Sequence, residues 1–183
     1  MRKPVLAGLI LAAVCAPLAV STASAQVSFT TPSDEAARGP RPLRERGPAL
    51  APALVAAQTA VEACEARGYQ VTAVLIDSAG VPVVMLSGNG AAAITQSIAL
   101  GKAVSALRNG KPTMALAAEA RTNKALADKL AADPQQGPQR PGGIPIMVGS
   151  SVIGAIAVSG APDGGWDAEC AQAGLAKAVA PKK

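Results

Sequence analysis

A glycine-rich loop, a lysine and a threonine are the residues of this chain that best suit the binding of an anionic ligand. The loop, Gly88-Asn89-Gly90, stands between a segment typical of a strand and one typical of a helix. A helix start presents unpaired N–H groups and a partial positive charge to an anion. Lys102 would pair with the same anionic group, and Thr113 would donate a hydrogen bond to it. We therefore predict a ligand site between this loop, the helical segment around Lys102, and Pro112-Thr113.

The same loop superficially fits a dinucleotide-binding fingerprint, because Ala93 stands at its third small position. That fingerprint needs a parallel strand–helix–strand unit and an acidic residue at the end of the next strand. Here the preceding strands are expected to form a hairpin, and the following segment is expected to be helical. We interpret the loop as the glycine-rich start of a helix.

Histidine is absent from the sequence, which removes His-based triads, His-containing zinc sites and a His-ligated haem. The serines at Ser150-Ser151 and Ser159 therefore lack the usual activating base, although a Ser–Lys arrangement with Lys102 or Lys111 stays open. Turn formation and helix capping explain the nearby carboxylates without catalysis. These carboxylates are Asp77, Asp163, Asp167 and Glu169. We expect neither an enzyme nor a metal site.

A haem without a histidine ligand would need a soft or phenolic side chain on its iron. Four side chains of the expected domain have this chemistry, and each also fits an ordinary core or strand position. They are Tyr69, Met85, Met114 and Met147.

Glycine, proline and apolar spacing divide the rest of the chain into helices and strands. We expect helices over Leu50–Gly68, Ala91–Leu107, Met114–Ala132 and Trp166–Val179. We expect strands over Gln70–Ile76, Val81–Leu86, Ile144–Val148 and Val152–Ser159, with an exposed loop over Asp133–Gly143. The two pairs of strands are joined so tightly that each must be an antiparallel hairpin. The prediction is an α/β (α+β) fold, in which helices flank a single antiparallel sheet.

The first helix has its apolar residues at helical spacing, with a predicted core face of Leu50, Leu54, Ala57, Val61 and Cys64. Cys64 and Cys170 are the two cysteines left after the N-terminal segment described next. They would form a disulfide in an oxidising compartment, or else be two buried free thiols. We favour the disulfide, because export of the protein is well supported.

Residues 1–25 have the form of a secretory signal peptide. Two basic residues precede a short apolar run, and an Ala-x-Ala sequence ends at Ala25. A lipoprotein signal centred on Cys15 is disfavoured, because Val14 stands where a small residue is needed. Residues 26–49 are interpreted as a flexible N-terminal arm, and residues 50–183 as the folded domain. We expect a periplasmic or secreted protein.

The chain from Gln26 onward has 15 basic and 12 acidic residues, a net charge of +3. This charge is too small to indicate a nucleic-acid partner. No segment after Gln26 is long and apolar enough to span a membrane.

Three segments resemble the GlcG/HbpS-like haem-binding protein family. The first is the helix–strand–turn sequence from Ala63 to Pro82, and the second is Ala99–Ala106 with Gly110–Thr113. The third and most specific contains the Gly-Gly-x-Pro of Pro141–Ile146 and the Gly-Ala-x-x-Val-Ser-Gly of Val152–Ala161. The segment Asp167–Ala171 also fits the terminal helix of the family.

The resemblance implies a profilin-like fold that often assembles into homo-oligomers, with haem bound in some members and redox or glycolate-linked roles in others. The chain departs from the family in having no histidine and in carrying Ser87–Gly90 before the second helix. Our leading hypothesis is an exported, non-catalytic protein that binds haem or another small ligand. The alternatives are an assembly protein without a small ligand, and an enzyme acting on a small organic acid or peroxide.

Overall fold

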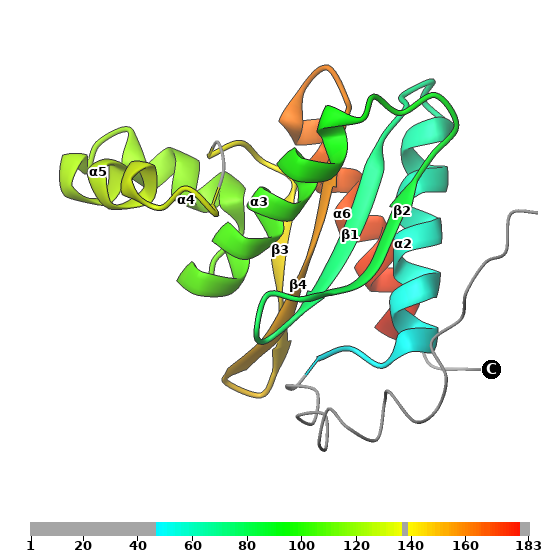
Figure 1. Ribbon diagram of the computed structural model, residues 1–183, viewed down its shortest axis with the longest axis horizontal. Helices are drawn as coiled ribbons and strands as arrows, with labels where there is room; N and C mark the ends of the chain where they lie inside the picture. Colours follow the sequence, from blue (N-terminus) through cyan, green and yellow to red (C-terminus); the bar gives the residue numbers. More distant parts are fainter. Residues whose placement is uncertain (1–46, 137–138, 180–183) are drawn as a thin grey trace, which may run out of the picture. The chain divides into compact units, whose positions relative to one another are not determined.

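Two hairpins of the chain combine into one antiparallel sheet in the computed structural model, which describes residues 47–136 and 139–179. The strands are β1 (Thr72–Asp77), β2 (Pro82–Ser87), β3 (Gly143–Val148) and β4 (Ser151–Ser159), in the spatial order β2-β1-β4-β3 (Figure 1). The two central strands pair along their whole common length, with Val74 opposite Ala157. The predicted antiparallel α/β fold is therefore confirmed.

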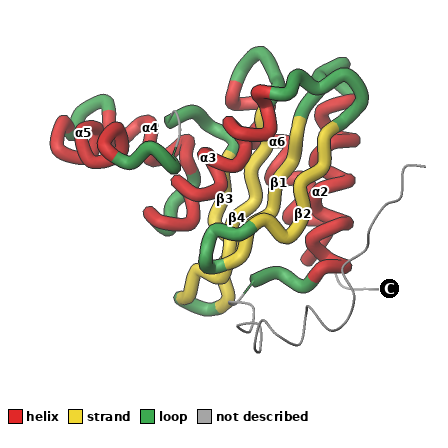
Figure 2. Tube along the Cα trace, viewed as in Figure 1, coloured by secondary structure: helices red, strands yellow, loops and turns green. Residues whose placement is uncertain are grey.

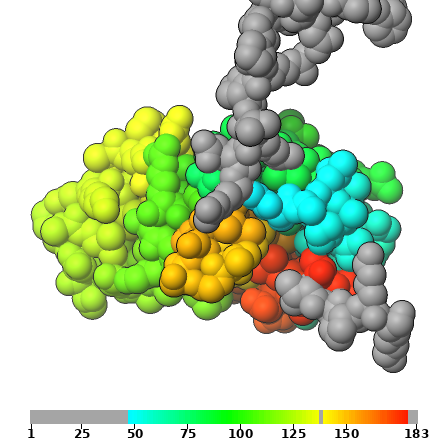
Figure 3. All heavy atoms as spheres, turned by 90° about the horizontal axis from the view of Figure 1, so that it is seen from below, coloured from blue at the N-terminus to red at the C-terminus, as the bar shows by residue number. Residues whose placement is uncertain are grey.

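Helices cover both faces of this sheet (Figure 2). The helices α2 (Leu50–Glu65) and α6 (Gly164–Val179) pack side by side on one face, and α3 (Ile94–Asn109) packs on the other. Two shorter helices, α4 (Thr113–Ala120) and α5 (Lys124–Ala132), extend away from the sheet beyond α3. In the space-filling view of Figure 3, α2 and α6 adjoin each other, and α4 and α5 lie at the opposite end, against α3.

Strand β1 separates two hydrophobic cores. Its residues Ala73 and Leu75 face α2 and α6, whereas Val74 and Ile76 face α3. Successive side chains of a strand point to opposite faces of the sheet, so a strand covered on both faces needs an unbroken apolar run. The run from Ala73 to Ile76 meets this requirement, and all four residues are buried.

A disulfide between Cys64 and Cys170 joins α2 to α6, with the two Cα atoms 5.7 Å apart. The helices approach closely beside it, because a Cβ added to Gly174 would lie only 2.3 Å from the carbonyl oxygen of Ala56. The structure thus agrees with the expected disulfide and places it within the α2–α6 core.

The predicted core face of α2 is wrong at its N-terminal end. Leu50 and Leu54 are 57% and 49% exposed. The buried face is made mainly of small residues, which permit the close approach to α6. The buried residues of this helix are Ala53, Ala56, Ala57, Ala60, Val61 and Cys64.

Most element boundaries differ from the prediction by one to three residues, and the following differences in the helices and in one loop bear on the site. The helix predicted over Met114–Ala132 is two helices, because the side chain of Asn123 accepts a hydrogen bond from the Leu126 N–H and starts a new helix there. Helix α3 begins at Ile94 rather than Ala91, and α6 begins at Gly164 rather than Trp166. The loop predicted to be exposed over Asp133–Gly143 is buried at Gln136 and at its final two glycines.

The first 46 residues lie outside the described part of the chain. These residues include the predicted signal peptide of residues 1–25 and nearly all of the predicted arm of residues 26–49. Both therefore stay predictions, as does the boundary of the folded domain. No helix within residues 47–136 and 139–179 is long and apolar enough to cross a membrane.

We predict that loss of the disulfide destabilises the fold by about 3–5 kcal/mol. The two cysteines are separated by 106 positions, and a cross-link over so long a loop strongly restricts the unfolded chain. The measurement is urea unfolding of the protein with and without a reducing agent. The Cys64→Ala/Cys170→Ala variant is the control, because its stability should be low in both conditions and independent of the reducing agent. Equal stability of oxidised and reduced protein would contradict the prediction.

Candidate functional site

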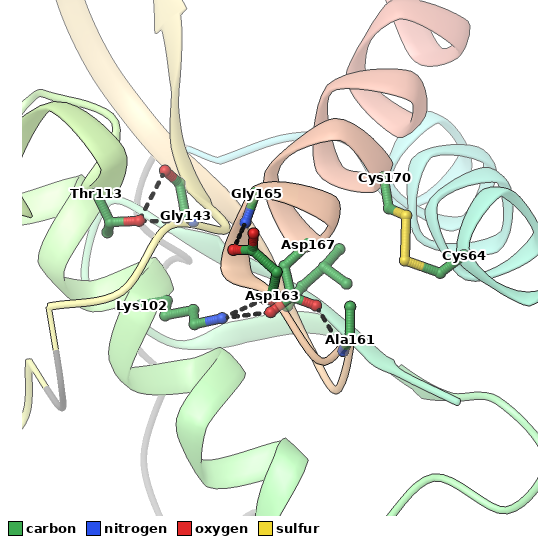
Figure 4. A network of polar contacts seen from close by, with 10 residues as sticks. Cys64, Lys102, Thr113, Gly143, Ala161, Asp163, Gly165, Asp167 and Cys170 are labelled. Atoms are coloured by element: carbon green, nitrogen blue, oxygen red, sulfur yellow. Dashed lines mark hydrogen bonds and ion pairs between the residues drawn. A yellow bond between two sulfur atoms is a disulfide. The ribbon is translucent and has the colours of Figure 1, made fainter. Parts of the chain in front are cut away.

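The side chain of Lys102 lies inside the protein, in a polar network at the start of α6 (Figure 4). It is only 1% exposed. Its Nζ donates hydrogen bonds to Asp167 Oδ2 at 2.7 Å and to the carbonyl oxygen of Val158 at 3.0 Å. This lysine therefore connects α3 to β4 and to α6.

Asp167 completes the network from the first turn of α6, where a carboxylate interacts favourably with the helix dipole. Its Oδ1 accepts a hydrogen bond from the Ala161 N–H at 3.0 Å, while Oδ2 receives the Lys102 ammonium. The carboxylate thus also fixes the turn between β4 and α6.

Burial acts on both members of this ion pair. It lowers the pKa of the Lys102 ammonium and raises the pKa of the Asp167 carboxyl, because removal from water disfavours either charge. The attraction between the two groups opposes both shifts, whereas the nearby Arg140 lowers the pKa of Lys102 further. The two charges are therefore interdependent, and each is costly without the other.

Two glycines allow the chain to pass against Lys102. A Cβ on Gly142 would lie 2.9 Å from Lys102 Nζ, and one on Gly143 would lie 2.4 Å from the Lys102 carbonyl oxygen. The φ of Gly142 is 129°, a conformation that favours glycine. The buried Thr113 hydroxyl holds the next residue in place by accepting a hydrogen bond from the Gly143 N–H at 2.9 Å.

The five residues of the predicted ligand site do not line one common cavity. Gly90 lines a cavity of about 270 Å³ with Tyr69, and Lys102 lines another of about 170 Å³. Thr113 is fully buried, and its neighbour Pro112 lines a third cavity of about 310 Å³. The predicted single pocket is therefore divided. Lys102 and Thr113 already have partners inside the protein.

The remaining two residues of the predicted site also differ from the expectation. Asn89 is exposed, and a Cβ on Gly88 would lie 2.5 Å from the carboxylate of Glu65. Because α3 begins only at Ile94, the loop does not lead directly into the helix. The Gly88–Gly90 loop is therefore not the helix start that the sequence predicted.

The cavity of about 310 Å³ lies between α4, β3 and α6, and its lining is mainly apolar. Met114, Ile144 and Ala168 contribute apolar surface, and Glu169 contributes a carboxylate. This carboxylate is bound by Arg67 Nη1 at 2.8 Å, and the Arg67 guanidinium lies 4.3 Å from the ring centre of Trp166. We call this space the Met114 cavity.

A larger cavity of about 620 Å³ lies between α3, the β1–β2 turn and the loop around Gln135. Its apolar surface includes Leu100 and Leu107. Its cation, Arg108, is bound by Asp133 and Gln135. None of the four side chains proposed as iron ligands lines it.

Those four side chains occupy different surroundings. Met114 is 48% exposed and lines the Met114 cavity. Met147 and Met85 are also exposed, and they lie on β3 and β2, the two opposite edge strands of the sheet. Tyr69 is half-buried, and its ring centre lies 6.2 Å from that of Trp166.

The candidate nucleophiles are equally dispersed. Ser150 and Ser151 are exposed at the β3–β4 turn, whereas Ser159 is buried and lines the same cavity as Lys102. The Lys102 ammonium, however, donates to Asp167 and Val158, and Lys111 pairs with Glu119 at 2.8 Å. Within the described residues no group of three or more acidic or cysteine side chains could hold a metal ion.

Sequence reasoning missed the partnership of Lys102 with Asp167. Asp167 was assigned to helix capping, and its place in the first turn of a helix gives no sign of a lysine 65 positions earlier. The cationic neighbour Arg140 was placed in a loop and given no role. The pair could have been predicted only if Lys102 were known to be buried, and the sequence does not show that a lysine is buried.

We predict that Lys102→Met and Asp167→Leu each destabilise the protein by about 3–5 kcal/mol, because each leaves one buried group without its partner. The Lys102→Met/Asp167→Leu double variant should lose much less than the sum of the two single losses. Urea unfolding of the four proteins provides this comparison as a double-mutant cycle. Strictly additive losses would refute the coupling.

Comparison with known proteins identifies the family. The model of the family described as "Haem degrading protein HbpS-like" matches residues 49–176. A search of curated proteins gave no match.

Several solved structures are similar to the chain. A double mutant of HbpS from Streptomyces reticuli is 30% identical with a TM-score of 0.66, over 84% of this chain and 97% of that one. ORFY of Klebsiella pneumoniae is 22% identical with a TM-score of 0.68, over 78% and 98% of the two chains. A PduOC–haem complex is 20% identical with a TM-score of 0.66, over 73% and 95%. These matches, together with the fold and the family model, show that the chain belongs to the HbpS-like family.

Proposed function

We propose that this protein binds haem and that the Met114 cavity receives it. Two comparisons support a haem ligand: the family description refers to haem degradation, and a solved structure of similar fold is a haem complex. The observation that carries the location is the combination of an apolar cavity with a thioether at its edge.

The side chains of this protein that can coordinate haem iron favour the Met114 cavity as the haem site. The sequence has no histidine, and Cys64 and Cys170 are joined in a disulfide, so methionine and tyrosine are the side chains of the folded domain left to hold haem iron. Met114 lines an apolar cavity, whereas Tyr69 lines one shared with Gln70 and Thr95. A porphyrin has a large apolar body, so the surroundings of Met114 suit it better.

The size of the Met114 cavity and the cations near it are also consistent with a haem site. Ligand cavities are usually about 300–1,000 Å³, so 310 Å³ would enclose one edge of a porphyrin and leave the remainder open to solvent. Lys111 precedes the lining residue Pro112 and pairs with Glu119, and Arg67 binds the lining residue Glu169. Such cations suit the propionate groups of haem.

We further propose that the protein is exported and acts without catalysis. The signal-peptide pattern of residues 1–25 supports export. Ser159 shares a cavity with Lys102, but the Lys102 ammonium donates its hydrogen bonds to Asp167 and to the Val158 carbonyl oxygen. This supports binding rather than turnover, because a catalytic nucleophile needs a free base within hydrogen-bond reach. Bound haem would supply redox chemistry at its iron. The residues described here supply an apolar surface, a thioether and nearby cations.

We predict a saturable shift of the Soret band when the purified protein is titrated with hemin. Met114→Leu should weaken binding about ten-fold or more and change the absorption spectrum, because it removes the thioether but keeps the volume of the side chain. Met147→Leu is the matched control, since Met147 has nearly the same exposure but lies outside the cavity. Its titration should equal that of the unmodified protein.

Three results of the hemin titration would overturn the proposal. Hemin that fails to saturate any stoichiometric site would reject haem binding. A normal Met114→Leu titration together with a weakened Tyr69→Phe titration would move the site to the cavity beside Tyr69. A reductant could instead cause steady loss of the Soret band in the unmodified protein but not in Met114→Leu. The function would then be haem degradation and not haem binding alone.

We also propose that the protein forms homo-oligomers, for which the exposed apolar side chains of α2 provide support. Leu50, Leu54 and Val55 are between 42% and 57% exposed. Clustered apolar residues at a surface commonly mark an interface between proteins.

We predict that light scattering will give a mass several times the 18.0 kDa of one chain. Leu50→Ser/Leu54→Ser should lower this mass toward the monomer, because it replaces the apolar contact surface. Ile94→Ser, at an equally exposed residue of α3, is the control and should leave the mass unchanged. A monomeric unmodified protein at working concentration would reject the assembly.

A further inference from the structure

One ion pair sets the charge at the rim of the Met114 cavity. Glu169 is the only charged residue among the described residues that line this cavity. Arg67 does not line it, but its Nη1 donates a hydrogen bond to Glu169 Oε2 at 2.8 Å. The charge that a ligand meets at this rim therefore depends on a residue outside the cavity.

Three contacts hold Arg67 beside Glu169. The Arg67 guanidinium lies 4.3 Å from the ring centre of Trp166, within the range of a cation–π interaction. The Arg67 backbone N–H donates a hydrogen bond to the Cys64 carbonyl oxygen at 3.0 Å. The disulfide from Cys64 to Cys170, the residue after Glu169, links the two segments that contain the pair. Because these contacts already restrict both segments, forming the pair costs less conformational entropy than forming an isolated surface pair.

The pair changes the kind of ligand that the cavity favours. A lone carboxylate beside an apolar cavity repels an anionic ligand and attracts a cationic one. With Arg67 bound to Glu169 the rim is neutral, and this repulsion is removed. The two side chains are 41% and 58% exposed, so the effect of their charges should be modest and sensitive to salt.

We propose that Arg67 determines the charge selectivity of the Met114 cavity, and that it admits an anionic ligand by neutralising Glu169. The role of Arg67 rests on the proposed haem site, where the anionic groups are the propionates. Arg67 is then a positioning residue that acts through Glu169, and not a ligand of the iron. The affinity for hemin should follow the net charge of the pair, which is positive in Glu169→Gln and negative in Arg67→Gln.

Hemin titrations in low-salt buffer test this order in the unmodified protein, the two single variants and the double variant. We expect Arg67→Gln to weaken hemin binding about five-fold and Glu169→Gln to strengthen it about two-fold, since exposed charges interact weakly. The Arg67→Gln/Glu169→Gln variant should bind within about two-fold of the unmodified protein, because its rim is again neutral. Loss of packing at Arg67 would give no such rescue.

Two further conditions separate the charge effect from a change in packing. In about 1 M NaCl the difference between Arg67→Gln and the unmodified protein should disappear, because the Debye length falls to about 3 Å. Hemin dimethyl ester has no ionised propionate, so Arg67→Gln should not weaken its binding.

Arg108→Gln is the matched control. The Arg108 side chain is 42% exposed and also pairs with a carboxylate, that of Asp133. It borders the cavity of about 620 Å³ and not the Met114 cavity. Its removal also leaves one carboxylate unpaired, but far enough from the rim that hemin binding should stay unchanged.

The outcomes distinguish this role of Arg67 from the haem site itself. Hemin that saturates no site in the unmodified protein overturns both. Saturable hemin binding that Arg67→Gln does not weaken, or that Glu169→Gln weakens, overturns the role of Arg67 alone. A weakened Arg67→Gln variant that Glu169→Gln fails to rescue does the same, because Arg67 would then act without Glu169. Circular dichroism of each variant shows that it is folded, and Glu169→Gln alone decides the matter if Arg67→Gln does not fold.

Discussion

The buried ion pair between Lys102 and Asp167 determines how three elements of this fold meet. The lysine comes from α3 on one face of the sheet, and the aspartate from the start of α6, which covers the other face. Their contact lies at the end of β4, where the Val158 carbonyl oxygen accepts the second hydrogen bond of the Lys102 ammonium. Few buried charges are tolerated unless they are paired and fully hydrogen-bonded, so this geometry leaves little freedom to the surrounding chain.

Glycines allow that geometry to form. Gly142 and Gly143 pass so close to Lys102 that any side chain would overlap it. At the other end of the network, Gly160 has a φ of 138° and lies where a Cβ would be 2.4 Å from the Gln70 carbonyl oxygen. The Gly-Gly-x-Pro and Val-Ser-Gly motifs are thus explained by close packing around the ion pair. Their first role is structural, whatever ligand the neighbouring cavities bind.

The sheet could be predicted from the sequence because its signals are local. Short apolar runs and glycine turns specify each hairpin, and the structure confirms both hairpins and their antiparallel pairing. The helix errors have a different cause. Alanine favours a helix at every position, so composition alone shows neither the break at Asn123 nor which face of α2 is buried. The exposed Leu50 and Leu54 show that small residues, rather than large ones, form the contact with α6.

The candidate site was only partly predictable, because it depends on contacts between distant segments. The sequence analysis selected Lys102 and Thr113 by residue type as ligand-binding residues, and that role stays a prediction. In the structure each has a buried partner far away in the sequence, at Asp167 and Gly143. Their polar atoms therefore contribute to the fold before they contribute to any ligand.

Two cavities adjoin the network formed by Lys102, Asp167 and their hydrogen-bond partners. The segment from Arg140 to Gly143 and the first turn of α6 contribute residues both to the cavity of about 170 Å³ beside Lys102 and to the Met114 cavity. A wall held by buried hydrogen bonds and close glycine contacts resists local movement, because displacement would break several interactions at once. The same constraint that fixes α3 against α6 therefore gives both cavities a preorganised wall, and preorganisation lowers the cost of binding.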